Sequence, residues 1–129
     1  MNTIAKNEYY TIVTDKNKNR LYLTVEGFWK NRDAVPNYIT DMKKALDELS
    51  REYTILADVS RMKPPPAEIA AVHNESQKQA IAAGLKKTAE IVGEDVIAKM
   101  TVDRYAKESG MPKMTFSDKK EAEAWLDED

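Results

Sequence analysis

The stretch that decides the fold runs from Tyr53 to Pro66 and has the sequence Tyr-Thr-Ile-Leu-Ala-Asp-Val-Ser-Arg-Met-Lys-Pro-Pro-Pro. Its first half is almost continuously apolar, as expected for a strand that is covered on both faces. A helix should begin near Pro66, because proline is tolerated in the first helical turn, where its missing N–H has no partner to lose. In sheets flanked by helices, ligands and partners gather at the carboxyl ends of the strands. The segment from Asp58 to Glu68 is therefore the predicted working face.

Length and composition limit the class of protein. The 129 residues contain four glycines and no repeat, which predicts one domain spanning residues 1–129. The absence of cysteine excludes disulfides, thiolate zinc sites and a cysteine nucleophile. The net charge of -2, with both signs scattered, provides no basic stripe for a nucleic acid. No apolar run approaches a membrane span and no signal-peptide core is present, so we expect a cytoplasmic protein without a transmembrane segment.

Two segments near the N-terminus predict a β-hairpin. Residues 8–14 are rich in aromatic and β-branched side chains, and residues 20–26 alternate apolar with polar side chains. Turn-forming and charged residues separate the two segments. The basic side chains of Lys16, Lys18 and Arg20 are better explained by a solvated turn than by an anion site.

The next segment predicts the first helix. Apolar residues recur every three or four positions from Val35 to Leu49, which gives one helical stripe. Pro36 belongs in the first turn, which favours Asp33 as the N-cap. Phe28 and Trp29 precede this helix, and two large aromatics at a strand exit either plug the end of the core or line a pocket.

Downstream of the prolines, strands and helices alternate. We expect a helix at 67–83, a strand at 85–92, a helix after Gly93-Glu94-Asp95, a strand at 113–116 and a last helix capped by Ser117. A hairpin followed by four strand–helix units predicts an α/β layered domain, with a mixed, mostly parallel five-stranded sheet and four helices. A ferredoxin-like α+β layout is the alternative.

Two parts of the chain resemble a known family. The strand ending Leu56-Ala57-Asp58-Val59-Ser60 is similar to the Asp-Leu-Ser step of SpoIIAA-like domains, which are related to the STAS fold. The tail Phe116-Ser117-Asp118-Lys119-Lys120-Glu121-Ala122-Glu123-Ala124-Trp125-Leu126 resembles the F-x-D-x-x-E-A-x-x-W-L ending of an uncharacterised bacterial branch of that group. The resemblance spans nearly the whole chain and implies the fold and an interaction face.

The chain departs from this family at its regulatory position. In anti-sigma-factor antagonists, a serine near the start of the second helix is phosphorylated by a partner kinase. Here the segment from Pro64 to Ile69 contains neither serine nor threonine, and the nearest hydroxyl belongs to Ser60. Glu68 carries a fixed negative charge near the position of that phosphate, but a plain first-turn acid is the favoured explanation. The resemblance does not carry over the switch.

Few residues offer catalytic chemistry. His73, the single histidine, has no recognisable catalytic spacing to its neighbours, and we expect a partly exposed helical histidine. Asp58 is the best-placed acid, and its simplest role is to accept hydrogen bonds from the following loop. No glycine-rich phosphate loop, nucleophile elbow or metal-ligand cluster occurs in the sequence. The sequence therefore predicts no cofactor, no metal and no enzyme.

Three classes of function remain open. The first is a regulatory module that binds an unidentified protein partner, or a second copy of itself, through Asp58, Ser60, Met62, Pro64, Pro65, Pro66 and Glu68. The second is a carrier of a small apolar molecule or lipid, with a pocket lined by Phe28, Trp29, Tyr38, Met62 and Met100. The third is an enzyme that uses Asp58 and His73, which requires the two side chains to converge in one cleft. We favour the interaction module.

Overall fold

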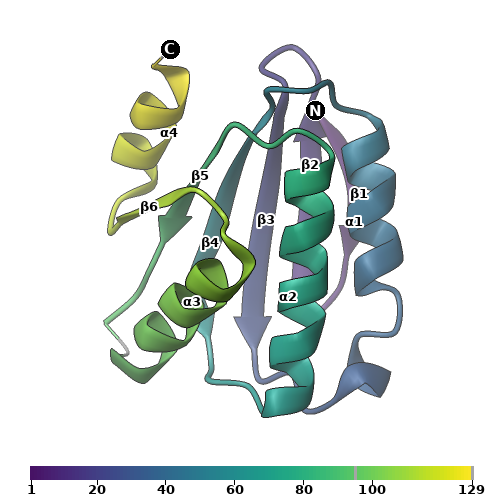
Figure 1. Cartoon of the computed structure of the whole chain (residues 1–129), viewed down its shortest axis with the longest axis vertical. Coiled ribbons are helices and arrows are strands. Elements are labelled where there is room, and N and C mark those ends of the chain that lie inside the picture. The colour runs from purple at the N-terminus through teal and green to yellow at the C-terminus, as the bar shows by residue number, and fades with distance from the viewer. Residues whose placement is uncertain (95, 129) are drawn as a thin grey trace.

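The computed structural model describes residues 1–94 and 96–128, and its centre is a six-stranded sheet (Figure 1). The strands lie in chain order across the sheet. The first three are antiparallel, and the last four, from the third onward, are parallel to one another. The strands are β1 (Asn2–Lys6), β2 (Tyr10–Asp15), β3 (Arg20–Gly27), β4 (Thr54–Met62), β5 (Lys87–Ile91) and β6 (Lys113–Phe116).

The sheet has one strand more than the predicted five, because β1 precedes the predicted hairpin. The side chain of Asn7 accepts hydrogen bonds from the N–H groups of Tyr9 and Tyr10, and so forms the turn that joins β1 to β2. Ile4 and Ala5 both pack against the core, and the register shifts between Thr3 and Ala5. This irregularity removes the period of two from which strands are recognised. The edge of the sheet is therefore β1 and not the first hairpin strand.

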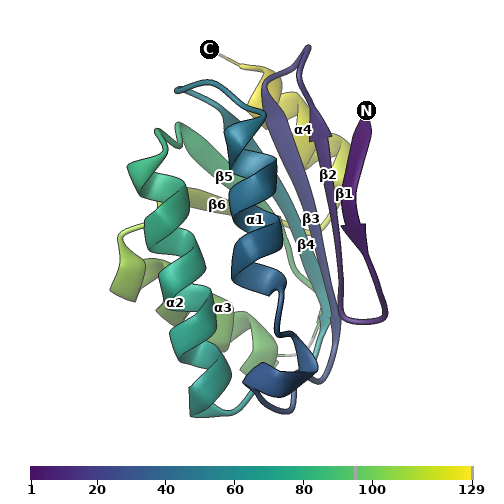
Figure 2. The same ribbon diagram turned by 90° about the vertical axis from the view of Figure 1, so that its right-hand side faces the viewer.

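Helices cover the two faces of the sheet unequally. A 3₁₀ helix (Arg32–Ala34), α1 (Tyr38–Asp47), α2 (Ala67–Ala82), α3 (Val96–Ser109) and α4 (Lys119–Asp127) make up the helical part. Figure 2 shows α1, α2 and α3 on one side of the sheet and α4 on the other. Successive right-handed crossovers between neighbouring parallel strands place their helices on the same face. The last helix connects no strands, so this constraint does not apply to α4.

This arrangement confirms an α/β fold with four α-helices and a mainly parallel mixed sheet. The order of elements differs from the β-α-β-β-α-β order of a ferredoxin-like domain. The predicted central strand is indeed interior, between β3 and β5. Ile55 and Ala57 belong to the larger core cluster beneath α1 and α2, and Leu56 belongs to the smaller cluster beneath α4.

Two of the predicted N-cap residues are wrong, although a residue nearby in the sequence acts as a cap in each case. Asp33 lies inside the 3₁₀ turn, whose N-cap Asn31 accepts a hydrogen bond from the Ala34 N–H. Pro36 disfavours helical backbone at Val35, where the 3₁₀ turn ends, and helix α1 begins at Tyr38 with Asn37 as its N-cap residue. Asp118, not Ser117, caps α4 by accepting from the Lys120 N–H.

The start of the third helix falls partly outside the described residues, because the predicted acidic pair includes Asp95. Gly93, just before it, lies so close to β4 that a Cβ atom there would be 2.6 Å from the Ser60 carbonyl oxygen. The exit of β5 therefore requires glycine. Among the described residues, no helix combines the length and apolarity needed to cross a bilayer.

Candidate functional site

The junction between β4 and α2 forms an uncovered corner at the carboxyl ends of the parallel strands (Figure 1). Pro64, Pro65 and Pro66 are all partly exposed, and Pro66 is the N-cap residue of α2. Glu68 is exposed in the first turn of this helix. The Lys63 N–H donates a 2.9 Å hydrogen bond to the Gly27 carbonyl, which holds the end of β3 beside the proline loop.

That hydrogen bond joins the residue before Phe28 to the residue before the prolines. Phe28 directly follows Gly27 and is 48% exposed, so an apolar side chain is exposed one residue from that hydrogen bond. We call Phe28, Lys63, the three prolines and Glu68 the proline corner. It presents an aromatic ring, a stiff apolar loop and one carboxylate on neighbouring backbone segments.

The other residues of the predicted interaction face lie elsewhere. Met62 is only 4% exposed and belongs to the larger core, on the side of β4 that faces α1 and α2. Asp58 shares the opposite side with Leu56, because side chains alternate along a strand. The register shift between Asp58 and Arg61 interrupts this alternation before Met62. The Asp58 Oδ1 accepts from the Ser60 N–H at 3.0 Å and from its hydroxyl at 2.6 Å. Asp58, Ser60 and Met62 therefore do not join the prolines in one continuous face.

The predicted ligand pocket is also only partly present. Tyr38 and Met62 line a cavity between the sheet and the helices. Trp29 is 1% exposed and plugs the core, with its indole N–H donating to the carbonyls of Tyr9 and Glu26. Met100 is 66% exposed, and like Phe28 it lies at the surface and not on the cavity wall.

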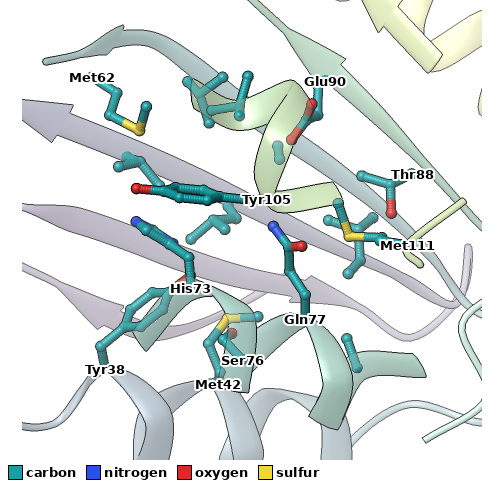
Figure 3. Close-up of a pocket in the computed structure, with 17 residues that line it drawn as sticks. Tyr38, Met42, Met62, His73, Ser76, Gln77, Thr88, Glu90, Tyr105 and Met111 are labelled. Atoms are coloured by element: carbon teal, nitrogen blue, oxygen red, sulfur yellow. The ribbon is translucent and has the colours of Figure 1, made fainter. Parts of the chain in front are cut away.

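The cavity lies between β3–β5 and the three helices on their side, and its volume is about 50 Å³ (Figure 3). Helix α3 approaches α2 more closely than it approaches any strand, which leaves this space beneath it. The volume suffices for a few water molecules and is far below the roughly 300 Å³ of the smallest usual ligand pockets. The polar side chains on its wall belong to His73, Ser76, Gln77, Thr88, Glu90 and the two tyrosines Tyr38 and Tyr105.

His73 is buried, contrary to the expectation of partial exposure. Its ring stacks between Trp29 and Tyr105, with centroid separations of 4.9 and 5.2 Å. Position 73 lies next to Val72 and Ser76 on the inward stripe of α2, which explains its burial. Burial lowers the pKa of His73 to about 4, so the imidazole is neutral at physiological pH. It faces the cavity as an uncharged aromatic ring.

Glu90 is a buried carboxylate at the far wall of the cavity. The Lys113 ammonium group lies 2.8 Å from Glu90 and also pairs with Asp103 of α3. Burial raises the pKa of Glu90, and Lys113 opposes that rise. This chain of charges ties α3 to β5 and β6.

Two hydroxyl groups of the cavity wall are unpaired. Thr88 Oγ1 and the Tyr105 phenol oxygen are fully buried, and neither has a hydrogen-bond partner among residues 1–94 and 96–128. Figure 3 shows the Tyr105 oxygen on the side of His73 and Met62. Buried polar groups nearly always have partners, so an unpaired hydroxyl on a cavity wall needs an explanation.

Asp58 and His73 do not form a catalytic pair. Asp58 lies on the side of the sheet that faces α4, whereas His73 lies on α2 against the opposite side. Within the described ranges, no cluster of three or more histidine, cysteine or acidic side chains could hold a metal ion.

Sequence reasoning missed the polar residues of the cavity. Thr88 and Glu90 alternate along β5 with Ala89 and Ile91, which pack beneath α4. Two polar residues at alternating positions of a strand buried on both faces were the available signal. The apolar residues of this segment were sufficient to predict the strand, so the two polar residues were not considered as part of a site.

Comparison of the chain with models of known protein families, with curated proteins and with solved structures gives no match.

Proposed function

We propose that this chain is a non-enzymatic regulatory domain that binds a partner protein through the proline corner. The observation that carries the proposal is the hydrogen bond from Lys63 to Gly27, which joins the backbone just before the half-exposed Phe28 to the backbone just before three partly exposed prolines. Aromatic side chains are enriched at the energetic centres of protein interfaces. Prolines hold the loop in one conformation, so little conformational entropy is lost when a partner binds.

The resemblance to SpoIIAA-like domains supports this proposal. Because α2 follows β4, it starts at the end of the sheet where the carboxyl ends of the parallel strands lie. SpoIIAA-like domains meet their partners at this end. The segment from Pro64 to Ile69 offers no hydroxyl for phosphorylation. The hydroxyl of Ser60 is already engaged by Asp58. We therefore propose a corner with a fixed charge at Glu68 in place of a phosphorylation switch.

The lipid-carrier alternative receives less support from the cavity. A carrier of this kind needs several hundred cubic ångströms of apolar space, whereas the cavity measures about 50 Å³.

A pull-down from a lysate of the source organism tests the proposal. Glu68→Lys and Phe28→Asp should each reduce capture of a specific partner at least fivefold, because both side chains are exposed and their loss leaves the core intact. Glu121→Lys is the matched control, since it reverses an exposed charge on α4, on the other side of the sheet. Circular dichroism should show equal folding of all four proteins.

Equal capture by the wild type and both corner variants would contradict the proposal. The same variants also address self-association. If the partner is a second copy, Phe28→Asp should convert a dimer to a monomer in size-exclusion chromatography, and Glu121→Lys should not.

A further inference from the structure

We propose that the surface beneath α4 is a docking site for the α4 of a second copy of this chain, so that two copies exchange this helix and form a dimer. This surface lies on the face of the sheet opposite α1, α2 and α3 (Figure 2), and it is separate from the proline corner. The dimer therefore goes beyond the proposed function. The reasons are the single connection of α4, the charges that receive it and the open edge of the sheet beside it.

Helix α4 can leave the sheet without unfolding another element. It follows β6 through Ser117 and Asp118 and is the last element of the described chain, so only this short connection must change. Ala122 and Leu126 are its buried residues. Of the described residues in the larger core cluster, none belongs to α4. The larger core is therefore complete without this helix, whereas α1, α2 and α3 each join two strands.

The sheet receives α4 with charges that belong to the strands and remain when the helix leaves. Arg20 of β3 is 3% exposed, and its Nε donates a 2.9 Å hydrogen bond to the Thr54 hydroxyl, which holds the guanidinium on the sheet. The guanidinium pairs with Glu123 and, at 3.0 Å, with Asp127. Lys87 of β5 donates to two carbonyls at the end of α4. A helix with carboxylates four residues apart matches this surface, and each copy of the chain supplies such a helix.

The neighbouring edge of the sheet gives a second copy room to approach. Strand β6 is outermost in the described sheet and has β5 as its one neighbour. Met114 of β6 is 47% exposed, and its pairing with Ala89 places it on the face that α4 covers. Exposed edge strands are common sites of association between chains. A second copy at this edge covers Met114 and brings its own α4 close to the docking site.

The connection between β6 and α4 sets the balance between the closed monomer and the exchanged dimer. Both forms contain the same contacts between α4 and the sheet. The covalent connection favours the monomer in dilute solution, and the dimer gains as the protein concentration rises. A connection that is too short to fold back favours the dimer.

A charge exchange between two full-length variants tests the proposal. Glu123→Lys and Arg20→Glu each place like charges between α4 and the sheet of the same chain, so each variant weakens its own contact. In a mixture, the wild-type pair forms again only when the Arg20→Glu chain docks its α4 on the Glu123→Lys chain. The two substituted side chains, which have opposite charges, then meet in the other site. Native mass spectrometry should show a mixed dimer at least tenfold more abundant than the dimer of either variant alone.

Glu121→Lys is the matched control for Glu123→Lys, because it reverses an exposed charge of α4 that lies outside the contact with Arg20. Its mixture with the Arg20→Glu chain should show no enrichment of a mixed dimer. Equal amounts of mixed dimer with Glu121→Lys and Glu123→Lys, or none with either, would overturn the proposal.

The length of the connection provides a second test that leaves Arg20 in place. Deletion of Ser117 should produce a dimer in size-exclusion chromatography at a concentration where the wild type is a monomer. A flexible glycine–serine insertion after Ser117 is the matched control and should give a monomer. Adding Glu123→Lys to the deletion variant should weaken the dimer at least tenfold, whereas adding Phe28→Asp, in the proline corner, should not. A monomeric deletion variant, or a dimer that Glu123→Lys leaves unchanged, would overturn the proposal.

Discussion

His73 shows how one buried position controls the chemistry of its surroundings. Its imidazole is held between Trp29 and Tyr105, and Tyr38 meets it edge-on with a centroid separation of 5.8 Å. Aromatic pairs of these kinds stabilise a core beyond the area that they bury. Because the ring is enclosed, folding favours its neutral form, and protonation is therefore coupled to unfolding.

This coupling predicts a pH dependence of stability. The pKa of His73 is about 4 in the folded protein and about 6.5 in the unfolded chain, so below pH 6.5 the unfolded state binds more protons. The stabilisation is complete above pH 6.5 and is lost as the pH falls towards 4. Between pH 7 and pH 5 the loss should be about 2 kcal/mol, as measured by urea unfolding.

His73→Phe provides the comparison, because it keeps an aromatic ring and removes the titration. The difference in unfolding free energy between wild type and variant should change by about 2 kcal/mol across that pH range. Glu90 titrates in both proteins, so its contribution cancels in this difference. A constant difference would show that the pKa of His73 is the same in the folded and unfolded states.

At the scale of elements, α4 is attached differently from the other helices. Arg20 of β3 is buried and pairs with Glu123 and Asp127, so it is not part of the solvated turn that the sequence suggested. The Lys87 ammonium group donates to the carbonyls of Trp125 and Glu128 at the end of α4. Polar anchors therefore supplement the small apolar cluster beneath this helix.

The two tryptophans should differ in their contribution to stability. Trp29→Ala should cost about 3–5 kcal/mol, because the indole is fully buried and makes two hydrogen bonds. Trp125 is partly exposed, with the Lys87 ammonium 4.4 Å from its ring centre. Trp125→Ala should therefore cost about 2 kcal/mol. Denaturant unfolding of both variants measures this, and equal losses would contradict the packing described for α4.

At the scale of the whole molecule, the strands in the middle of the sheet are expected to be more stable than the strands at its edges. Strand β4 pairs on both sides and is covered on both faces, whereas β1 and β6 each have one neighbour. The three crossover helices share one face, which is why the larger core and the cavity lie there.

Hydrogen exchange should follow this order. Amides of β4 should exchange only through global unfolding, because they are interior to both the sheet and the core. Amides of β1 should exchange at least a hundredfold faster, since that edge strand opens locally. Mass spectrometry of exchanged peptides measures the ratio, and equal protection of β1 and β4 would contradict the described arrangement.

The sequence by itself determined most elements of this protein, β1 excepted, because local patterns encode them. The apolar run at Ile55–Ala57, the periodicity from Val35 to Leu49 and the prolines before α2 were sufficient to predict the central strand, two helices and an α/β class. The resemblance to SpoIIAA-like domains remains a prediction.

Only the tertiary structure decided which side chains meet. It placed Asp58 and His73 on opposite sides of the sheet, buried Arg20 against α4, and brought Thr88 and Tyr105 to one cavity. These outcomes depend on strand register, on the side of the sheet that each helix occupies and on the close approach of α3 to α2. All three depend on contacts between residues that are distant in the chain, so the local periodicity of the sequence cannot predict them.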